Sequence, residues 1–455
     1  MLPAAPTNLV GAFGAGLFDP AEKVAIASQL QSRDERRKEE GDFVNSVYSL
    51  SNSALALLQS GQVAEGKEAT KLAQDLVATR IEAIDQGASK SGVREERVSN
   101  CLEALAKVEI LEQFFKTGVL VSKSELGSFY RDEEYLGGVM GLLEELVSYS
   151  VGRASDLDVA SITLCRDVMV EIQGELMLFD FRNGGLRRRY DGVKYHIKKM
   201  NDILYALSLV QGAPEAAGDG APAEKRQKLS HDADGAETSK LPALVEIGGI
   251  RARQMEYDEK REQVIKRARD IQKPAKLAIY DIHRDSVGKS DQKIADCIRV
   301  AKEMLPVIQE LPRLRYGSFG NAMEELAEAK LFRVWVSEKR LCTRAEMEVV
   351  EVEEYLGGLF DLTGEINRYA VKCATARDTE RLGQCLETVL VIDEFLKSVP
   401  LPFKLNKKMK ELGNSLSKMK NMTYELALIK AGKGISSPLD VEAEAGPKGA
   451  QEEQD

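Results

Sequence analysis

Histidine and tryptophan are scarce in this chain of 455 residues, which holds three histidines, one tryptophan and six cysteines. The histidines, His196, His231 and His283, are too few to predict a histidine metal site or a Ser-His-Asp triad. The cysteines form no close pair of the kind that binds zinc, and they lie in amphipathic segments. We interpret them as reduced, buried thiols, so hydrolytic chemistry in this chain would have to use carboxylates.

Long apolar runs are also absent, because no stretch approaches the roughly 18 residues of a membrane span. The first 18 residues lack the positive leading region of a secretory signal, and we expect them to form a flexible lead. These features predict a protein of the cytoplasm and nucleus that has no membrane partner. The net charge of -10 excludes a uniformly basic coat for nucleic acid, so phosphate binding would need locally concentrated Lys and Arg.

Proline is infrequent, with 13 residues spread over the chain, and apolar residues recur at helical spacing rather than in alternation. The pattern predicts an all-α fold of two bundles with six to seven helices each. In the first half we predict helices over residues 19–59, 65–85, 98–117, 135–151, 156–181 and 186–209. In the second half we predict them over residues 255–283, 290–311, 321–337, 350–373, 379–396 and 405–430. Pro274 is expected to kink or divide the first of these.

Two stretches lose the helical pattern. Residues 212–241 are dominated by Ala, Gly, Pro, Glu and Asp and are expected to form a disordered linker. Residues 435–455 are expected to form an acidic disordered tail. The predicted domains are therefore 19–211 and 242–434. Within the linker, Lys225-Arg226-Gln227-Lys228 is either a nuclear import patch or a solvated charge cluster.

The two domains have the pattern of one fold repeated. Tyr-Leu-Gly-Gly begins at Tyr135 and again at Tyr355, 220 residues later. The last helices end in Tyr205-Ala-Leu and Tyr424-Glu-Leu, which are 219 residues apart. A matched spacing at both ends of a helical unit indicates gene duplication.

Carboxylates recur at helical spacing in the second domain. Asp361 and Glu365 are four residues apart, and Glu325 and Glu328 are three apart, so each pair shares a helix face. If the two helices pack side by side, the four oxygen ligands would suit Mg²⁺ or Mn²⁺, which would activate a water for phosphodiester cleavage. The alternative is ordinary solvent-facing acid on helices. Against that alternative, Asp361 interrupts an apolar face, where a carboxylate needs a metal or another partner.

The first domain provides an internal comparison. The residues opposite Glu325, Glu328, Asp361 and Glu365 are Ala104, Lys107, Gly141 and Glu145. Since one acid of four is kept, we expect the first domain not to hold the same metal.

A basic cluster distinguishes the last helix of the first domain. Its members are Arg187, Arg188, Arg189, Lys194, Lys198 and Lys199, with Tyr190 and Tyr195 between them. Such a helix can clamp phosphates and stack on bases. It can equally be a solvated helix whose tyrosines fill the core, and the spacing does not separate the two. A weaker basic counterpart in the second domain consists of Lys404, Lys407, Lys408 and Lys410.

These motifs resemble the translin family. The basic cluster from Arg187 and the Tyr135 stretch are similar to translin, whereas Glu325-Leu-Ala-Glu328-Ala and Asp361-Leu-Thr-Gly-Glu365 are similar to translin-associated factor X. The resemblance covers nearly all of both domains, so the chain looks like a fusion of two partners that are normally separate. One departure is Glu324, since factor X usually has Gln at that position.

The resemblance implies a hollow octameric shell of seven-helix subunits that binds RNA and single-stranded DNA. It also implies a Mg²⁺-dependent endoribonuclease that cleaves single-stranded RNA, such as passenger strands in RNA silencing or tRNA fragments. By position, Glu325, Glu328, Asp361 and Glu365 would be the metal-binding catalytic acids, and the first domain would be a non-catalytic RNA-binding partner. Four fused chains would complete a homo-oligomeric shell of eight units. The rival hypothesis is a non-catalytic scaffold that binds single-stranded RNA or DNA.

Overall fold

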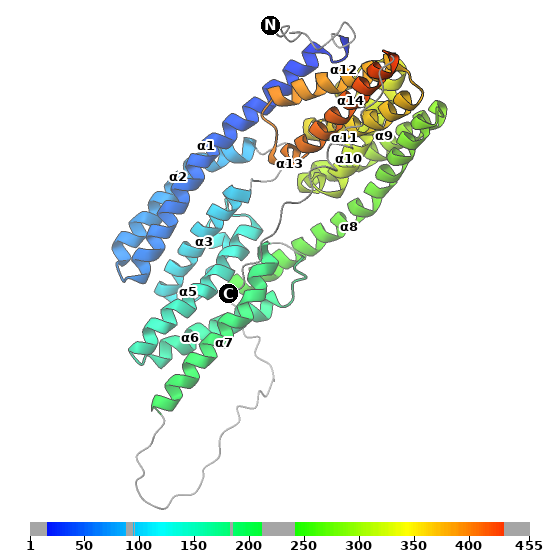
Figure 1. Cartoon of the computed structure of the whole chain (residues 1–455). Helices are drawn as coiled ribbons and strands as arrows, with labels where there is room; N and C mark the ends of the chain where they lie inside the picture. Colours follow the sequence, from blue (N-terminus) through cyan, green and yellow to red (C-terminus); the bar gives the residue numbers. More distant parts are fainter. Residues whose placement is uncertain (1–15, 88–93, 95, 183–184, 212–241, 432–455) are drawn as a thin grey trace, which may run out of the picture. The chain divides into compact units, whose positions relative to one another are not determined.

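The computed structural model describes residues 16–87, 94, 96–182, 185–211 and 242–431, and their regular structure is entirely helical (Figure 1). No strand occurs among these residues, so the predicted all-α class is confirmed. In the same part of the chain, no helix is long and apolar enough to cross a membrane. The predicted linker over 212–241 and tail over 435–455 lie outside the described residues.

The helices match the predicted order. In the first repeat they are α1 (Pro20–Gln59), α2 (Val63–Gly87), α3 (Glu96–Thr117), α4 (Lys123–Leu126), α5 (Asp132–Ser155), α6 (Val159–Leu176) and α7 (Gly185–Gln211). In the second they are α8 (Pro242–His283), α9 (Val287–Glu310), α10 (Ser318–Glu338), α11 (Val352–Thr375), α12 (Thr379–Ser398), α13 (Phe403–Asn406) and α14 (Met409–Lys430), with 3-10 helices η2 (Pro312–Arg315) and η3 (Ala345–Met347). The predictions missed the short elements, which carry too few residues to show a period.

Helix α8 differs most from the prediction. It begins at Pro242 rather than at residue 255, and it continues through Pro274 as a single helix. Of the two outcomes expected at this proline, division of the helix is therefore wrong, and a kink stays a prediction. A proline removes one backbone hydrogen bond, and the packing of a long helix can outweigh that local loss.

The chain forms two compact units that share their longest helices. The first unit comprises residues 37–261, and the second comprises residues 1–36 and 262–455, of which 16–36 and 262–431 are described. Helices α1 and α8 therefore contribute to both units. These boundaries differ from the expected domains, 19–211 and 242–434, because the divisions fall inside the long helices and not at the linker.

The start of the described chain belongs to the core of the second unit. Leu17 and Phe18, which we expected in a flexible lead, are only 1% and 4% exposed. The backbone N–H of Leu341 donates a 2.7 Å hydrogen bond to the carbonyl of Leu17, and the Phe18 ring lies 4.8 Å from that of Phe395 between centroids. Burial of these two large apolar side chains explains why the segment is held.

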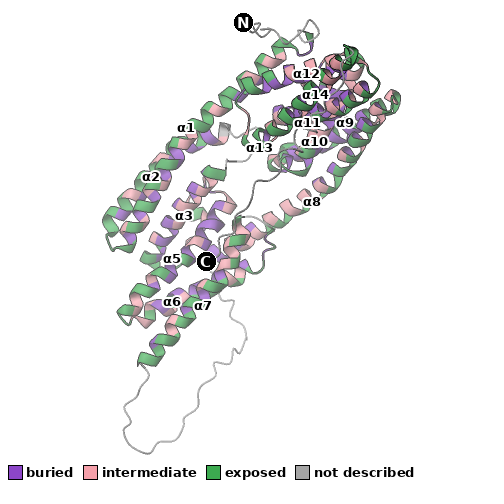
Figure 2. Ribbon diagram, in the orientation of Figure 1, coloured by how far each residue is buried: buried purple, intermediate pink, exposed green. Residues whose placement is uncertain are grey.

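Each unit is organised around the helix that begins near Tyr-Leu-Gly-Gly. In the first unit, α5 packs against α3, α6 and α7, and buried residues follow its inner face (Figure 2). In the second unit, α11 packs in the same way against α10, α12 and α14. All six cysteines are free and buried, as interpreted from the sequence.

Paired glycines let the central helices approach their neighbours closely. A Cβ atom added at Gly138 would lie 2.9 Å from the Cβ atom of Ala106, and one at Gly358 would lie 2.7 Å from that of Ala327. Any side chain at either glycine would clash with the adjacent helix. The α10–α11 contact is therefore as close as the α3–α5 contact, and it sets the two acid-bearing helices against each other.

Equivalent hydrogen bonds support the sequence alignment of the two repeats. The hydroxyl of Tyr135 donates to the carbonyl of Val121 at 2.8 Å, and the hydroxyl of Tyr355 donates to that of Cys342 at the same distance. A buried arginine pairs with a buried glutamate in each unit. The pairs are Arg94 with Glu134 and Arg315 with Glu354, each at 2.6 Å. The duplicated pattern in the sequence thus corresponds to duplicated contacts.

Candidate active site

Helices α10 and α11 bring the four predicted acids to one cavity of about 530 Å³ in the second unit. Glu325 and Glu328 come from α10, and Asp361 and Glu365 come from α11. These two helices pack side by side, which is the condition that the predicted cluster of acids required. The acids are therefore neighbours in space and not scattered over the surface.

Glu328 is the most buried of the four acids, at 8% exposure. Burial first, and then the negative charges of Asp361, Glu365 and Glu325, raise the pKa of its carboxyl to about 8, while Lys408 partly opposes them. No hydrogen bond or ion pair joins Glu328 to another described residue. Of the four acids, Glu328 is therefore the one that has no directly paired cation among the described residues.

Asp361 and Glu325 each have a lysine partner. The Lys408 ammonium lies 2.8 Å from both carboxylate oxygens of Asp361 and 3.3 Å from Glu324 Oε2. Burial lowers the pKa of Lys408, but the hydrogen bond and charge of Asp361, together with Glu324, outweigh burial and raise it. The Lys276 ammonium lies 3.0 Å from Glu325 Oε1.

Glu365 is held by two groups through the same oxygen. Its Oε2 atom lies 2.6 Å from His283 Nε2 and accepts a 3.0 Å hydrogen bond from Arg368. The imidazole of His283 packs at 4.8 Å from the ring of Phe332, between centroids. His283 is the last residue of α8. Its packing on Phe332 and its hydrogen bond together hold the side chain of Glu365, which belongs to α11, in place.

The donor set fits a hard divalent cation, although the side chains are now directed to other partners. Among the described residues, no three Asp, Glu, His or Cys side chains are positioned to hold one metal ion together. All four donors are carboxylates, and Glu328 has no cation of its own. Such oxygen-only sets suit Mg²⁺ or Mn²⁺. Binding by all four would require the lysine pairs to open.

The equivalent position in the first unit is filled by a lysine. The Lys107 ammonium lies 2.7 Å from Glu145 Oε1, and the Gln59 amide donates to Glu145 Oε2 at 2.6 Å. A Cβ atom at Gly141 would lie 2.7 Å from Cδ of Lys107, so the lysine stem occupies the space that an acid there would need. That the first unit does not hold the same metal stays a prediction.

The basic cluster of the first unit is partly paired. Arg189 lies 2.7 Å from Glu103 Oε1, and Arg187 lies 3.2 Å from Asp191. The exposed members are Arg188, Lys194, Lys198 and Lys199. They leave a row of solvated positive charge along α7.

The two tyrosines of this cluster have different environments. Tyr190 is half-buried against the core of the first unit, as the core-filling interpretation requires. Tyr195 is 64% exposed, and the Lys194 ammonium lies 5.0 Å from its ring centroid. An exposed aromatic ring can stack on a base.

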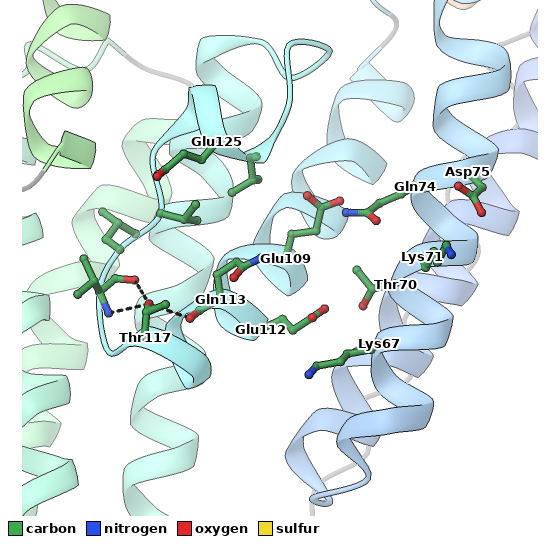
Figure 3. A pocket seen from close by; sticks show the side chains of 14 residues that line it. Lys67, Thr70, Lys71, Gln74, Asp75, Glu109, Glu112, Gln113, Thr117 and Glu125 are labelled. Atoms are coloured by element: carbon green, nitrogen blue, oxygen red, sulfur yellow. Dashed lines mark hydrogen bonds between the residues drawn. The ribbon is translucent and has the colours of Figure 1, made fainter.

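A larger cavity of about 690 Å³ lies in the first unit between α2 and α3, and no pattern in the sequence predicted it (Figure 3). The buried carboxyl of Glu109 accepts a 2.9 Å hydrogen bond from Tyr130, and burial raises its pKa to about 7. In Figure 3, Lys67 and Glu112 extend into the space from opposite helices. Because both lysines and acidic side chains line this cavity, its charge favours neither an anionic nor a cationic ligand.

Sequence reasoning did not assign His283, Lys276 or Arg368 to the site. The signal for His283 was its position at the end of a long helix, where Gln59 stands in the first repeat. Lys276 and Arg368 carried no comparable signal, since isolated basic residues on helices are common. Lys408 was grouped with other lysines but not with Asp361.

The translin family model matches residues 36–211 and 259–430. Translin of Gallus gallus is 34% identical over 93 residues, which cover 20% of this chain and 40% of that protein. Translin of Homo sapiens is 35% identical over 77 residues, which cover 17% of this chain and 34% of that protein. The chain thus spans less than half the length of these translins.

The Translin-associated protein X homolog of Schizosaccharomyces pombe is 26% identical over 197 residues, which cover 39% of this chain and 85% of that protein. Among solved structures, one described as "Structure of AfC3PO - duplex RNA complex" has 22% identity and a TM-score of 0.38, and covers 41% of this chain and 100% of its own. Because the family model matches both repeats and most of the chain, this protein belongs to the translin family as a tandem arrangement of two translin-type domains.

Proposed function

We propose that this protein is a Mg²⁺-dependent endoribonuclease that cleaves single-stranded RNA at the acidic cavity of the second unit. The observation that carries the proposal is Glu328, a buried carboxylate without a cation, beside Asp361, Glu365 and Glu325 at one cavity. Burying like charges together costs free energy, which a divalent cation would recover. Substrates of this class include passenger strands of small RNA duplexes and tRNA fragments.

The four acids would hold Mg²⁺ or Mn²⁺. When bound, the ion supplies a water of lowered pKa and neutralises charge on the phosphate. The chain's own residues prepare the site. His283 orients Glu365, and the buried position of Glu328 keeps one carboxylate away from bulk water. Arg368 and Lys276 at the cavity are suited to hold phosphate oxygens of the strand.

The first unit would bind RNA without cleaving it. The exposed cations of α7, Arg188, Lys194, Lys198 and Lys199, would contact phosphates, and Tyr195 would stack on a base. We further propose that four chains form a shell of eight units, working in cytoplasm and nucleus. Native mass spectrometry of the full chain tests the stoichiometry, with a four-chain mass expected and a monomer mass contradicting it.

Cleavage of a labelled single-stranded RNA by the purified protein tests the activity. We expect cleavage with Mg²⁺, none with EDTA, and a loss of at least about 100-fold for Asp361→Asn, since the variant keeps the shape but removes the charge. The matched control is Glu145→Gln in the first unit, whose partner is Lys107. It should cleave like the wild type.

The alternative is a single-strand-binding scaffold, favoured by the pairing of three of the four acids with basic groups. It predicts RNA binding, weakened by salt, without cleavage under any of these conditions. Tight RNA binding without RNA cleavage, both with Mg²⁺ and with EDTA, would overturn the nuclease proposal and support the scaffold.

A further inference from the structure

Lys408 contacts two acids, Asp361, which lines the acidic cavity, and Glu324, which does not. Its ammonium contacts both carboxylate oxygens of Asp361 at 2.8 Å, so a metal ion bound by Asp361 would need the same oxygen atoms. The ammonium also lies 3.3 Å from Glu324. Lys404 contacts Glu324 at 2.7 Å, and no contact joins it to Asp361.

The first unit shows what a permanently neutralised version of this site looks like. There, Arg189 contacts Glu103, the counterpart of Glu324, and Lys107 fills the space beside Gly141. In the second unit, Glu328 and Asp361 replace Lys107 and Gly141, so a cation is lost and two acids are gained. The cation that contacts Asp361 in the second unit is Lys408, which comes from a different position in the chain than Lys107.

We propose that Lys408 is a resident counter-cation of Asp361 that a divalent ion must displace, and that Glu324 retains the ammonium after displacement. This inference rests on the proposed function, because it assumes that the acidic cavity takes the ion. An ammonium and a divalent cation repel each other strongly at the spacing of one carboxylate, so the two compete for Asp361. The contact with Glu324 gives the lysine a second partner just outside the cavity.

Because Lys408 and the metal ion compete for Asp361, removal of Lys408 should increase the affinity for the metal ion. Removal of a basic group that only stabilises the fold would weaken or leave unchanged the binding of a cation. Removal of a competing cation strengthens it. We expect Lys408→Gln and Lys408→Met to bind Mn²⁺ about tenfold more tightly than the wild type, within the range usual for coupled sites.

The experiment is Mn²⁺ titration of the full chain without RNA, with free Mn²⁺ followed by electron paramagnetic resonance. Lys404→Gln is the matched control, since it removes a nearby charge that does not touch Asp361. It should change the affinity less than twofold. Glu328→Gln should weaken the same binding, which identifies the site. Thermal unfolding of each variant establishes that it is folded.

The outcomes separate this inference from the proposed function. Wild-type protein that binds Mn²⁺ and cleaves RNA, with no tightening in either Lys408 variant, overturns the inference and leaves the nuclease intact. Tightening in both variants without any RNA cleavage supports the inference and overturns the nuclease. Absence of Mn²⁺ binding in wild type and variants alike overturns both.

A second measurement uses the unmodified chain. Acetylation of lysines by dilute acetic anhydride, which transfers an acetyl group to a free amine and releases acetate, is followed by mass spectrometry and compares Lys408 with Lys404 in the absence and presence of Mn²⁺. Displacement from Asp361 should increase the modification of Lys408 several-fold and leave Lys404 unchanged. Equal modification of Lys408 with and without saturating Mn²⁺ would contradict the proposal.

Discussion

The imidazole of His283 lies 2.6 Å from Glu365 Oε2, and the amide of Gln59 lies at the same distance from Glu145 Oε2. Both partners stand at the last position of a long helix, and both acids stand on the central helix of a unit. The two repeats therefore orient an equivalent glutamate with different side chains. A group that orients a catalytic carboxylate can be tested without altering the carboxylate itself.

Replacement of His283 should lower the rate of RNA cleavage when the new side chain cannot form this hydrogen bond. We expect His283→Ala to reduce kcat by roughly 10–100-fold, as is usual for groups that support metal ligands. His283→Gln should retain most activity, because glutamine makes the equivalent contact in the first unit. Single-turnover cleavage measures both variants. Equal loss of activity in His283→Ala and His283→Gln would show that activity does not depend on the hydrogen bond to Glu365. Gln59→Ala, which removes the equivalent group of the first unit, serves as the control.

The raised pKa of Glu328 makes stability fall with increasing pH. Its folded pKa of about 8 lies above the ordinary value of 4.5, so the native state binds more protons between these values and loses stability as pH rises through them. Without metal, Glu328→Gln should match the wild type at pH 4 and exceed its free energy of unfolding by about 2–4 kcal/mol at pH 9. Denaturant unfolding in EDTA measures the difference.

The exposed Glu380 provides the comparison for that measurement. Glu380→Gln should change stability by less than about 0.5 kcal/mol at either pH. A Glu328→Gln variant that gains nothing at pH 9 would show that the carboxyl is not held in an unfavourable environment.

Gly358 is required for the close contact between α10 and α11. A Cβ atom there would lie 2.7 Å from Ala327 Cβ and 2.8 Å from the backbone nitrogen of Glu328, and a backbone atom cannot move aside cheaply. We expect Gly358→Ala to destabilise the second unit by about 1–3 kcal/mol. In α12, a Cβ atom at Gly383 meets nothing within 4 Å, so Gly383→Ala should be neutral or stabilising. Thermal unfolding distinguishes the pair, and equal effects would refute the packing argument.

Phe18 should contribute to stability even though it lies near the start of the chain. Its ring is 4% exposed and packs on Phe395, so Phe18→Ala should cost about 3–5 kcal/mol. Val24 is 69% exposed, and Val24→Ala should change stability by less than about 0.5 kcal/mol. If Phe18→Ala unfolds at the same denaturant concentration as the wild type, the segment is not part of the core.

Helix positions and the grouping of the acids were predictable from local pattern. A period of 3.6 residues and the Tyr-Leu-Gly-Gly repeat are encoded within short windows, and the spacing of Glu325, Glu328, Asp361 and Glu365 places them on helix faces. The side-by-side packing of α10 and α11 was a condition of the predicted site and was not itself derived from the sequence. The glycines at 357 and 358 supplied a reason for it that the sequence already contained.

The partners of the acids were not predictable, because they come from distant segments. His283 and Lys408 lie 82 and 47 residues from Glu365 and Asp361, and no local period records such distances. The division of α1 and α8 between the units was missed for the same reason. A continuous helix has the sequence pattern of one element. Contacts with distant residues, such as those of Leu17 with Leu341 and of Phe18 with Phe395, show to which unit the start of the chain belongs.

The sharing of α1 also sets the order in which the chain can finish folding. Arg344 donates its backbone N–H to Glu22 at 3.0 Å, and 322 residues separate the two. At ordinary rates of synthesis, Glu22 leaves the ribosome about 16–64 seconds before Arg344. During that interval the apolar residues Leu17 and Phe18 have no partner, and the second unit reaches its native core only when most of the chain has been made.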